Sequence, residues 1–207
     1  DGRVVGSEAG AADSALSELF GRRVRLATAA PEDFTIDMQV ASPDDAPGHG
    51  GSLVQQKLGA AYFAQAGAPS PVPATAFFDL FPLSVITTAT LAHLQALQPG
   101  SLFDSRRFRM NLVVESPAEG FVENAWLGRR VSVGGAALQV TMADPRCVMT
   151  TLAQDDLPQD LEVLRAVAAH NSLPFGGGDA KYPCAGVYAV VTTPGDVTIG
   201  APITLDG

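Results

Sequence analysis

A cysteine directly follows an arginine in "DPRCVMTT", residues 144–151, and this pair is the most chemically specific feature of the chain. A thiolate is both a nucleophile and a soft metal ligand, and a neighbouring cation such as Arg146 favours the charged form of Cys147. Adjacent residues of a strand point to opposite faces, so this help requires the strand to end or bulge there. Pro145 favours such an end because it cannot donate to a sheet ladder.

The alternative for Cys147 is a small core residue. A cysteine on a strand is more often buried packing than a reactive group. The only other cysteine is Cys184, which follows a proline and which we interpret as packing. Segment 144–151 by itself leaves both interpretations of Cys147 open.

A second polar cluster lies in "DSRRFRMNLVVE", residues 104–115. We expect a strand over 108–116, and Arg107, just before it, alternates with Arg109 and Asn111 so that the three share one face. Two guanidiniums and a carboxamide on one face suit an anionic ligand rich in hydrogen-bond acceptors, such as a phosphate carried by a heterocycle. The alternative is the polar outer face of a barrel, which fits Arg107 better than Asn111.

Composition limits the class of protein. The chain has 207 residues, 46% of them hydrophobic, which allows one large domain with a sizeable core. A net charge of -9 argues against nucleic acid and a polybasic membrane surface as partners. No apolar run approaches the roughly 18 residues of a membrane span. Two cysteines do not make a disulfide framework, so we expect a reducing cytoplasm.

Common catalytic motifs are absent from the sequence. It contains no G-x-S-x-G, H-E-x-x-H, P-loop or C-x-x-C pattern, and its three histidines are far apart. No zinc site is therefore predicted. The chemistry depends on Cys147 and the polar residues near it.

The elements needed to position these residues follow from apolar spacing. Helices are predicted near 13–21, over 86–97 with Thr87 or Thr88 as cap, and over 157–171 with Leu161 facing inward. Strands are predicted at 22–29, 108–116 and 146–152, as a hairpin over 126–145 turning at Gly134 and Gly135, and as two strands within 186–205. We divide the chain into a helix and strand at 1–40, a Pro/Gly/Ala-rich loop or insertion at 41–75, and a β-barrel at 76–207. Many short strands and no alternating βαβ pattern favour a mainly β barrel over a doubly wound sheet.

Four segments then occur in a characteristic order: "FFDLFPLSVITTATLAHL", "RRFRMNLVVE", "FVENAWLGRRVSVGGAALQVTMADPRCVMTTL" and "GVYAVVTTPGDVTIGAPI". In them the chain resembles the MOSC domain of molybdenum cofactor sulfurases, and especially the amidoxime-reducing branch and its bacterial relatives. The resemblance covers about residues 76–207. It implies a closed β-barrel with a few short flanking helices and a bound molybdenum cofactor (molybdopterin). Pyridoxal phosphate binding is implied at the level of the family.

The resemblance also implies roles for individual residues. Cys147 would be the catalytic residue and the thiolate ligand of molybdenum. The residues that would contact or lie near the cofactor are Arg146, Arg109, Asn111, Asp79 and Thr87. Met110 stands where the family has proline.

Three functions follow from this resemblance. The first is an oxidoreductase that reduces N-hydroxylated or similar small substrates, with electrons from a donor protein because the sequence has no flavin, haem or iron–sulfur motif. The second is a sulfur-carrier or cofactor-binding module in which a sulfur-donor protein loads Cys147 as a persulfide. The third is a barrel whose site has decayed.

Overall fold

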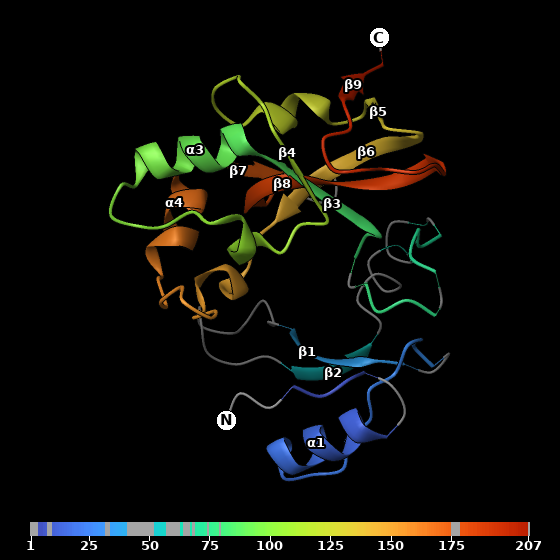
Figure 1. The fold of residues 1–207 in the computed structure, drawn as a ribbon. Coiled ribbons are helices and arrows are strands. Elements are labelled where there is room, and N and C mark those ends of the chain that lie inside the picture. Colours follow the sequence, from blue (N-terminus) through green and yellow to red (C-terminus); the bar gives the residue numbers. More distant parts are fainter. Residues whose placement is uncertain are drawn as a thin grey trace.

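The structure, a computed structural model, describes residues 4–7, 10–31, 34–40, 52–56, 63, 67, 69–73, 75–78, 80–174 and 179–206. Helix α1 (Ala11–Phe20) and a hairpin of β1 (Ile36–Val40) and β2 (Ser52–Gln56) lie apart from the larger sheet (Figure 1). The helix predicted near 13–21 is confirmed. The strand predicted at 22–29 is wrong, and β2 lies inside the segment predicted as a loop or insertion.

A seven-stranded curled sheet forms the main body of the protein (Figure 1). Its strand order is β4-β3-β8-β6-β5-β9, with β7 paired to β8. Only β3 and β4 run parallel, and the other pairs are antiparallel. The strands are β3 (Leu83–Thr87), β4 (Leu112–Val114), β5 (Arg130–Val133), β6 (Ala136–Pro145), β7 (Ser172–Pro174), β8 (Lys181–Thr193) and β9 (Ile203–Leu205).

The mainly β fold is confirmed, but the predicted closed barrel is wrong. Among the described residues the edge strands β4 and β9 do not pair with each other. Each has three residues and so few backbone groups to offer across the gap. Leu112 and Ile203 nevertheless pack on the same core clusters. A cavity of about 720 Å³ separates the two edges, so the sheet is a half-barrel.

The strand predicted at 146–152 is wrong, because a turn of 3-10 helix, η3 (Val148–Thr151), lies there instead. The strand predicted at 108–116 is confirmed only in β4 (Leu112–Val114), and a turn of 3-10 helix, η1 (Ser105–Phe108), precedes it in the arginine-rich segment. Asp104 caps η1 by accepting the backbone N–H of Arg106 at 2.8 Å. In η3 the hydroxyls of Thr150 and Thr151 donate to backbone carbonyls three residues earlier. Such local side-chain bonds compete with a sheet ladder, which alternating apolarity does not reveal.

Other local predictions were met in part. The hairpin of β5 and β6 turns at Gly134, where φ is 54° and an added Cβ would lie 2.7 Å from the Asp196 carbonyl oxygen. Helix α3 (Thr88–Leu97) is capped by the Thr87 hydroxyl, which accepts the Thr90 N–H at 3.1 Å. Helix α4 (Glu162–His170) begins later than predicted, and Leu161 is exposed instead of facing inward.

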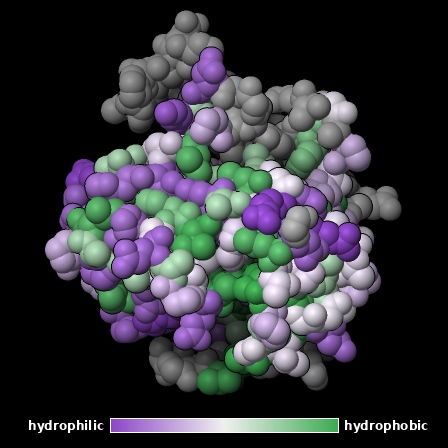
Figure 2. Space-filling view, turned by 90° about the horizontal axis from the view of Figure 1, so that it is seen from above, coloured by the Kyte–Doolittle hydropathy of each residue, from purple (hydrophilic) through white to green (hydrophobic). Residues whose placement is uncertain are grey.

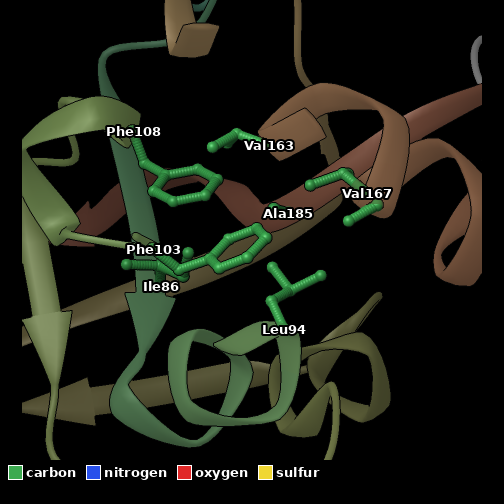
Figure 3. Close-up of a cluster of buried hydrophobic side chains, with 8 residues drawn as sticks. Ile86, Leu94, Phe103, Phe108, Val163, Val167 and Ala185 are labelled. Atoms are coloured by element: carbon green, nitrogen blue, oxygen red, sulfur yellow. The ribbon is translucent and has the colours of Figure 1, made fainter. Parts of the chain in front are cut away.

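The core that supports the site lies between the sheet and helices α3 and α4. Figure 3 shows Ile86 and Ala185 from the sheet, Leu94 from α3, and Val163 and Val167 from α4 meeting Phe103 and Phe108. Figure 2 shows the molecule from above relative to Figure 1, with hydrophobic residues gathered near the centre of that face and hydrophilic residues toward its margin. None of the helices in the described part of the chain is long and apolar enough to cross a membrane.

A buried carboxyl joins α3 to η2 (Val122–Trp126). Glu123 is 1% exposed, and its Oε2 accepts the hydroxyls of Thr87 and Thr90 at 2.7 Å each. Burial raises the pKa of this carboxyl above its ordinary value of 4.5, against the opposing effect of the two hydroxyls. We did not predict this residue, because its partners lie 36 and 33 residues away in the chain.

Replacing Leu94 by alanine should destabilise the protein by about 3 kcal/mol, because the side chain is fully buried and leaves a cavity. Leu97→Ala, one turn along the same helix, is the matched control, since Leu97 is 37% exposed. Urea unfolding followed by circular dichroism measures both. Equal losses for the two variants would contradict this account of the core.

Glu123 should also make stability depend on pH. Since the folded pKa lies above the unfolded one, the native state binds more protons. Its stabilisation is full below the unfolded pKa and is lost as pH rises through the folded pKa. Glu123→Gln should remove this decline, and the exposed Glu119→Gln should keep it. Free energies of unfolding measured from pH 4 upward test this, and parallel curves for wild type and Glu123→Gln would refute it.

Candidate functional site

A cleft of about 390 Å³ lies where β6 ends. It brings together four residues that the sequence singled out: Arg109, Asn111, Arg146 and Cys147. Its other wall is aromatic, and the side chains there are Phe77, Phe78, Phe81 and Tyr188, of which Phe81 and Tyr188 stack at 5.0 Å.

One of the two other predicted site residues, Thr87, is not brought into this cleft by the structure. Thr87 does not line it, because its side chain is fully buried as the cap of α3 and the partner of Glu123. Asp79 lies outside the described residues.

Cys147 is exposed and its thiol is free. Strand β6 ends at Pro145 after a shift in register between Ala143 and Pro145, which is the strand end that the proline predicted. Cys147 follows in extended conformation and caps η3, whose Thr150 donates its N–H and its hydroxyl to the Cys147 carbonyl at 3.2 and 3.0 Å. Cys147 is therefore not a core residue. Cys184 is, being fully buried, and burial raises the pKa of its thiol to about 11.

Arg109 places a positive charge at the cleft. Its backbone is left-handed, with φ 54° and ψ 40°, a conformation that L side chains rarely adopt. Its side chain is exposed, lines the cleft, and has no hydrogen-bond or ion-pair partner in the part of the chain that the structure describes. Strained backbone that carries a free guanidinium into a cleft is typical of a binding site.

Asn111 is held by Ser84, which sequence reasoning missed. The Asn111 Oδ1 accepts the Ser84 backbone N–H at 2.8 Å and the Ser84 hydroxyl at 3.0 Å. Both residues line the cleft. The signal in the sequence was weak, because a serine in an apolar strand segment is common.

Arg146 uses its charge inside the protein. Its guanidinium pairs with Asp144 at 2.5 Å and donates to the Phe108 carbonyl at 2.5 Å, with the Phe108 ring centroid 5.7 Å away. It also reaches the Met110 sulfur at 3.9 Å. The arginine beside the cysteine thus binds the segment that carries Arg109.

Arg107 reaches in the opposite direction, from its own segment to the segment that follows Cys147. We expected it to share an exposed face with Arg109 and Asn111, and that expectation is wrong, because the segment is helical there and Arg107 is 1% exposed. Its guanidinium donates to four carbonyls, those of Leu102, Thr150, Leu152 and Pro158, at 3.0, 3.5, 3.4 and 2.8 Å. Two of these carbonyls belong to the segment that follows Cys147.

Arg107 and Arg146 together form what we call the arginine clasp. Arg107 reaches from the cation-bearing segment to the thiol-bearing segment, and Arg146 reaches back. The clasp fixes the thiol and the free guanidinium on one cleft. Such a cleft can hold an anionic group beside a soft metal or a sulfur atom at Cys147.

Comparisons with known proteins show the family of this chain. The family model of the MOSC domain matches residues 73–204. The chain belongs to the MOSC domain family. It is 27% identical to mitochondrial amidoxime-reducing component 1 of Homo sapiens over 144 residues, which are 66% of this chain and 40% of that protein. Its identity to the same component of Mus musculus is 28% over 139 residues, 64% of this chain and 38% of that protein.

This MOSC chain therefore spans about 40% of the length of the curated relatives it matches. Among solved structures it is similar to YiiM from Geobacillus stearothermophilus, with a TM-score of 0.43 and 19% identity. That similarity covers 61% of this chain and 55% of the other.

Arg107→Lys should destabilise the protein by about 3 kcal/mol, because one ammonium cannot satisfy four carbonyls in two segments and leaves buried acceptors unpaired. The neighbouring Arg106→Lys is the matched control. Arg106 is exposed and pairs with Asp104 and Asp156 at the surface, so no measurable change is expected. Chemical denaturation compares the two, and an equal response would refute the structural role of Arg107.

Proposed function

We propose that this MOSC domain binds the molybdenum cofactor with Cys147 as the metal ligand. The observation that carries the proposal is that an exposed free thiol lies on the same cleft as a guanidinium that has no partner among the described residues. Membership of the MOSC family supports a function related to the molybdenum cofactor.

The residues of the cleft fit such a cofactor. A thiolate is a ligand suited to soft and borderline metals. Arg109 offers several N–H donors in a planar fork that matches a phosphate, and Asn111 adds an amide donor. Arg146 does not need to touch the cofactor, because in this structure it positions the segment that carries Arg109. Asp79 and Thr87 remain predictions from the resemblance only.

We further propose that the domain is an oxidoreductase for N-hydroxylated or similar small substrates. The bound metal would supply the two-electron chemistry, and a donor protein would supply the electrons. Cys147 would fix the metal, Arg109 and Asn111 would orient the pterin group, and the aromatic wall would keep water away from that side of the cleft. The curated relatives are named for amidoxime reduction, at 27% and 28% identity.

A sulfur-carrier module is the second candidate. It is favoured by the open position of Cys147, whose neighbours Val148 and Met149 are 56% and 44% exposed, so that a protein could reach the thiol. In that case a sulfur-donor protein would load Cys147 as a persulfide.

The cytoplasmic location stays a prediction from the sequence, as does pyridoxal phosphate binding. The matched relatives are named as mitochondrial.

The decisive experiment is metal and pterin analysis of protein produced in a host that makes the cofactor. Wild type should contain close to one molybdenum per chain, and Cys147→Ala should lose it. Cys184→Ala is the matched control and should keep it, because Cys184 is buried away from solvent. Elemental mass spectrometry gives the stoichiometry.

Three outcomes separate the candidates. Full molybdenum in Cys147→Ala would remove the ligand role. A wild-type protein without molybdenum, but with one extra sulfur atom on Cys147 by intact-mass analysis, would favour the carrier. If the wild-type protein holds neither molybdenum nor extra sulfur, the remaining hypothesis is a barrel whose site has decayed.

A further inference from the structure

The contact between Ser84 and Asn111 decides which atoms the cleft offers to a ligand. Three hydrogen bonds join the two residues. The Asn111 Oδ1 accepts the N–H and the hydroxyl of Ser84, and the Asn111 N–H donates to the Ser84 Oγ at 3.3 Å. One of the two donors to Oδ1 is a backbone N–H, which cannot turn away.

The register of the sheet explains this contact. The parallel ladder of β3 and β4 begins at the pair Val85 and Leu112, so Ser84 and Asn111 stand one residue before it. There the side-chain amide oxygen of Asn111 takes the place that a backbone carbonyl would have in a continued ladder. A flipped amide would set its NH₂ against the Ser84 N–H, so the hydrogen bonds fix the orientation.

The consequence concerns the free end of the amide. With Oδ1 occupied by two donors, Asn111 can offer only the N–H groups of Nδ2, which have no protein partner among the described residues. Arg109, two residues earlier, also offers only donors. Among the described residues on this side of the cleft, Arg109 and Asn111 therefore offer a ligand only hydrogen-bond donors.

We infer that Ser84 is a specificity-determining positioning residue: by holding Oδ1 of Asn111 it makes this wall of the cleft select an oxyanion group such as a phosphate. The inference deepens the proposed function, on which it rests for the identity of the natural ligand. Ser84 acts through Asn111.

Substitutions at Asn111 and Ser84 test the two parts of the inference separately. Asn111→Asp keeps the shape and can still accept from Ser84, but it presents a negative oxygen where the amide presented N–H groups. Ser84→Ala removes the hydroxyl bond and leaves only the backbone N–H to hold the amide. Ser84→Thr restores a hydroxyl in a residue that suits a strand.

The test is titration of the cofactor-free protein with inorganic phosphate at constant ionic strength, followed by the Asn111 side-chain amide and backbone amide signals in NMR. Wild type should show saturable binding. Ser84→Ala should weaken it by about fivefold and Ser84→Thr should recover most of that loss. Asn111→Asp should weaken it by at least about thirtyfold. Ser132→Ala is the matched control, because Ser132 bonds Asp206 on β5, and it should bind phosphate like wild type.

A purely structural role for Ser84 predicts a different result. The melting temperature of Ser84→Ala would fall while its phosphate affinity, measured well below that temperature, stayed at the wild-type value, and this would overturn the inference. Absence of saturable phosphate binding in wild type, or equal affinity in Asn111→Asp, would overturn it as well. Because phosphate binding is measured without the cofactor, a protein that shows the expected affinities but never holds molybdenum would refute the proposed function alone.

Discussion

The arginine clasp is the interaction on which the geometry of the site depends. Arg107 is a buried cation whose hydrogen bonds all go to carbonyls, and Arg146 is a half-buried cation paired with Asp144. A buried charge is costly unless it is paired, so each arginine holds its acceptors firmly. Each arginine has at least one acceptor on the opposite segment, Thr150 for Arg107 and Phe108 for Arg146. The thiol and the free guanidinium consequently keep a fixed relation although both lie outside regular strands.

The backbone strain at Arg109 is supported by the core beneath it. Phe108 is 1% exposed and packs with α3 and α4, while its carbonyl is held by Arg146. With Phe108 fixed on the inner side, the next residue turns outward through a left-handed conformation and carries its guanidinium into the cleft. Met110 then returns to the core, where its methyl group sits against Gly186, a position with φ 86° and no room for a Cβ. Met110, which stands in place of the family's proline, thus anchors the loop by packing.

The half-barrel gives the site a rigid floor and leaves the opposite edge of the sheet open. Strand β8 pairs with β3, β6 and β7, and the cleft forms where β6 stops and β3 begins. Ser84 joins that floor to the cation-bearing segment through Asn111. The gap between β4 and β9 lies at the outer edges of the sheet, so the site does not require closure of the barrel.

Four residues of the cleft, the mainly β class, the hairpin at Gly134 and the cap at Thr87 could be predicted from the sequence, because each depends on local chemistry or on short-range periodicity. It could not assign Arg107, since a run of arginines does not say which one turns inward, and alternation suggested a strand where Asp104 caps a 3-10 turn. Glu123 and Ser84 escaped notice because their partners lie 27 to 36 residues away in the chain. The open sheet and the two arginines that cross between segments could be recognised only in the folded protein. Both depend on long-range contacts whose energy is set by burial, which no local pattern records.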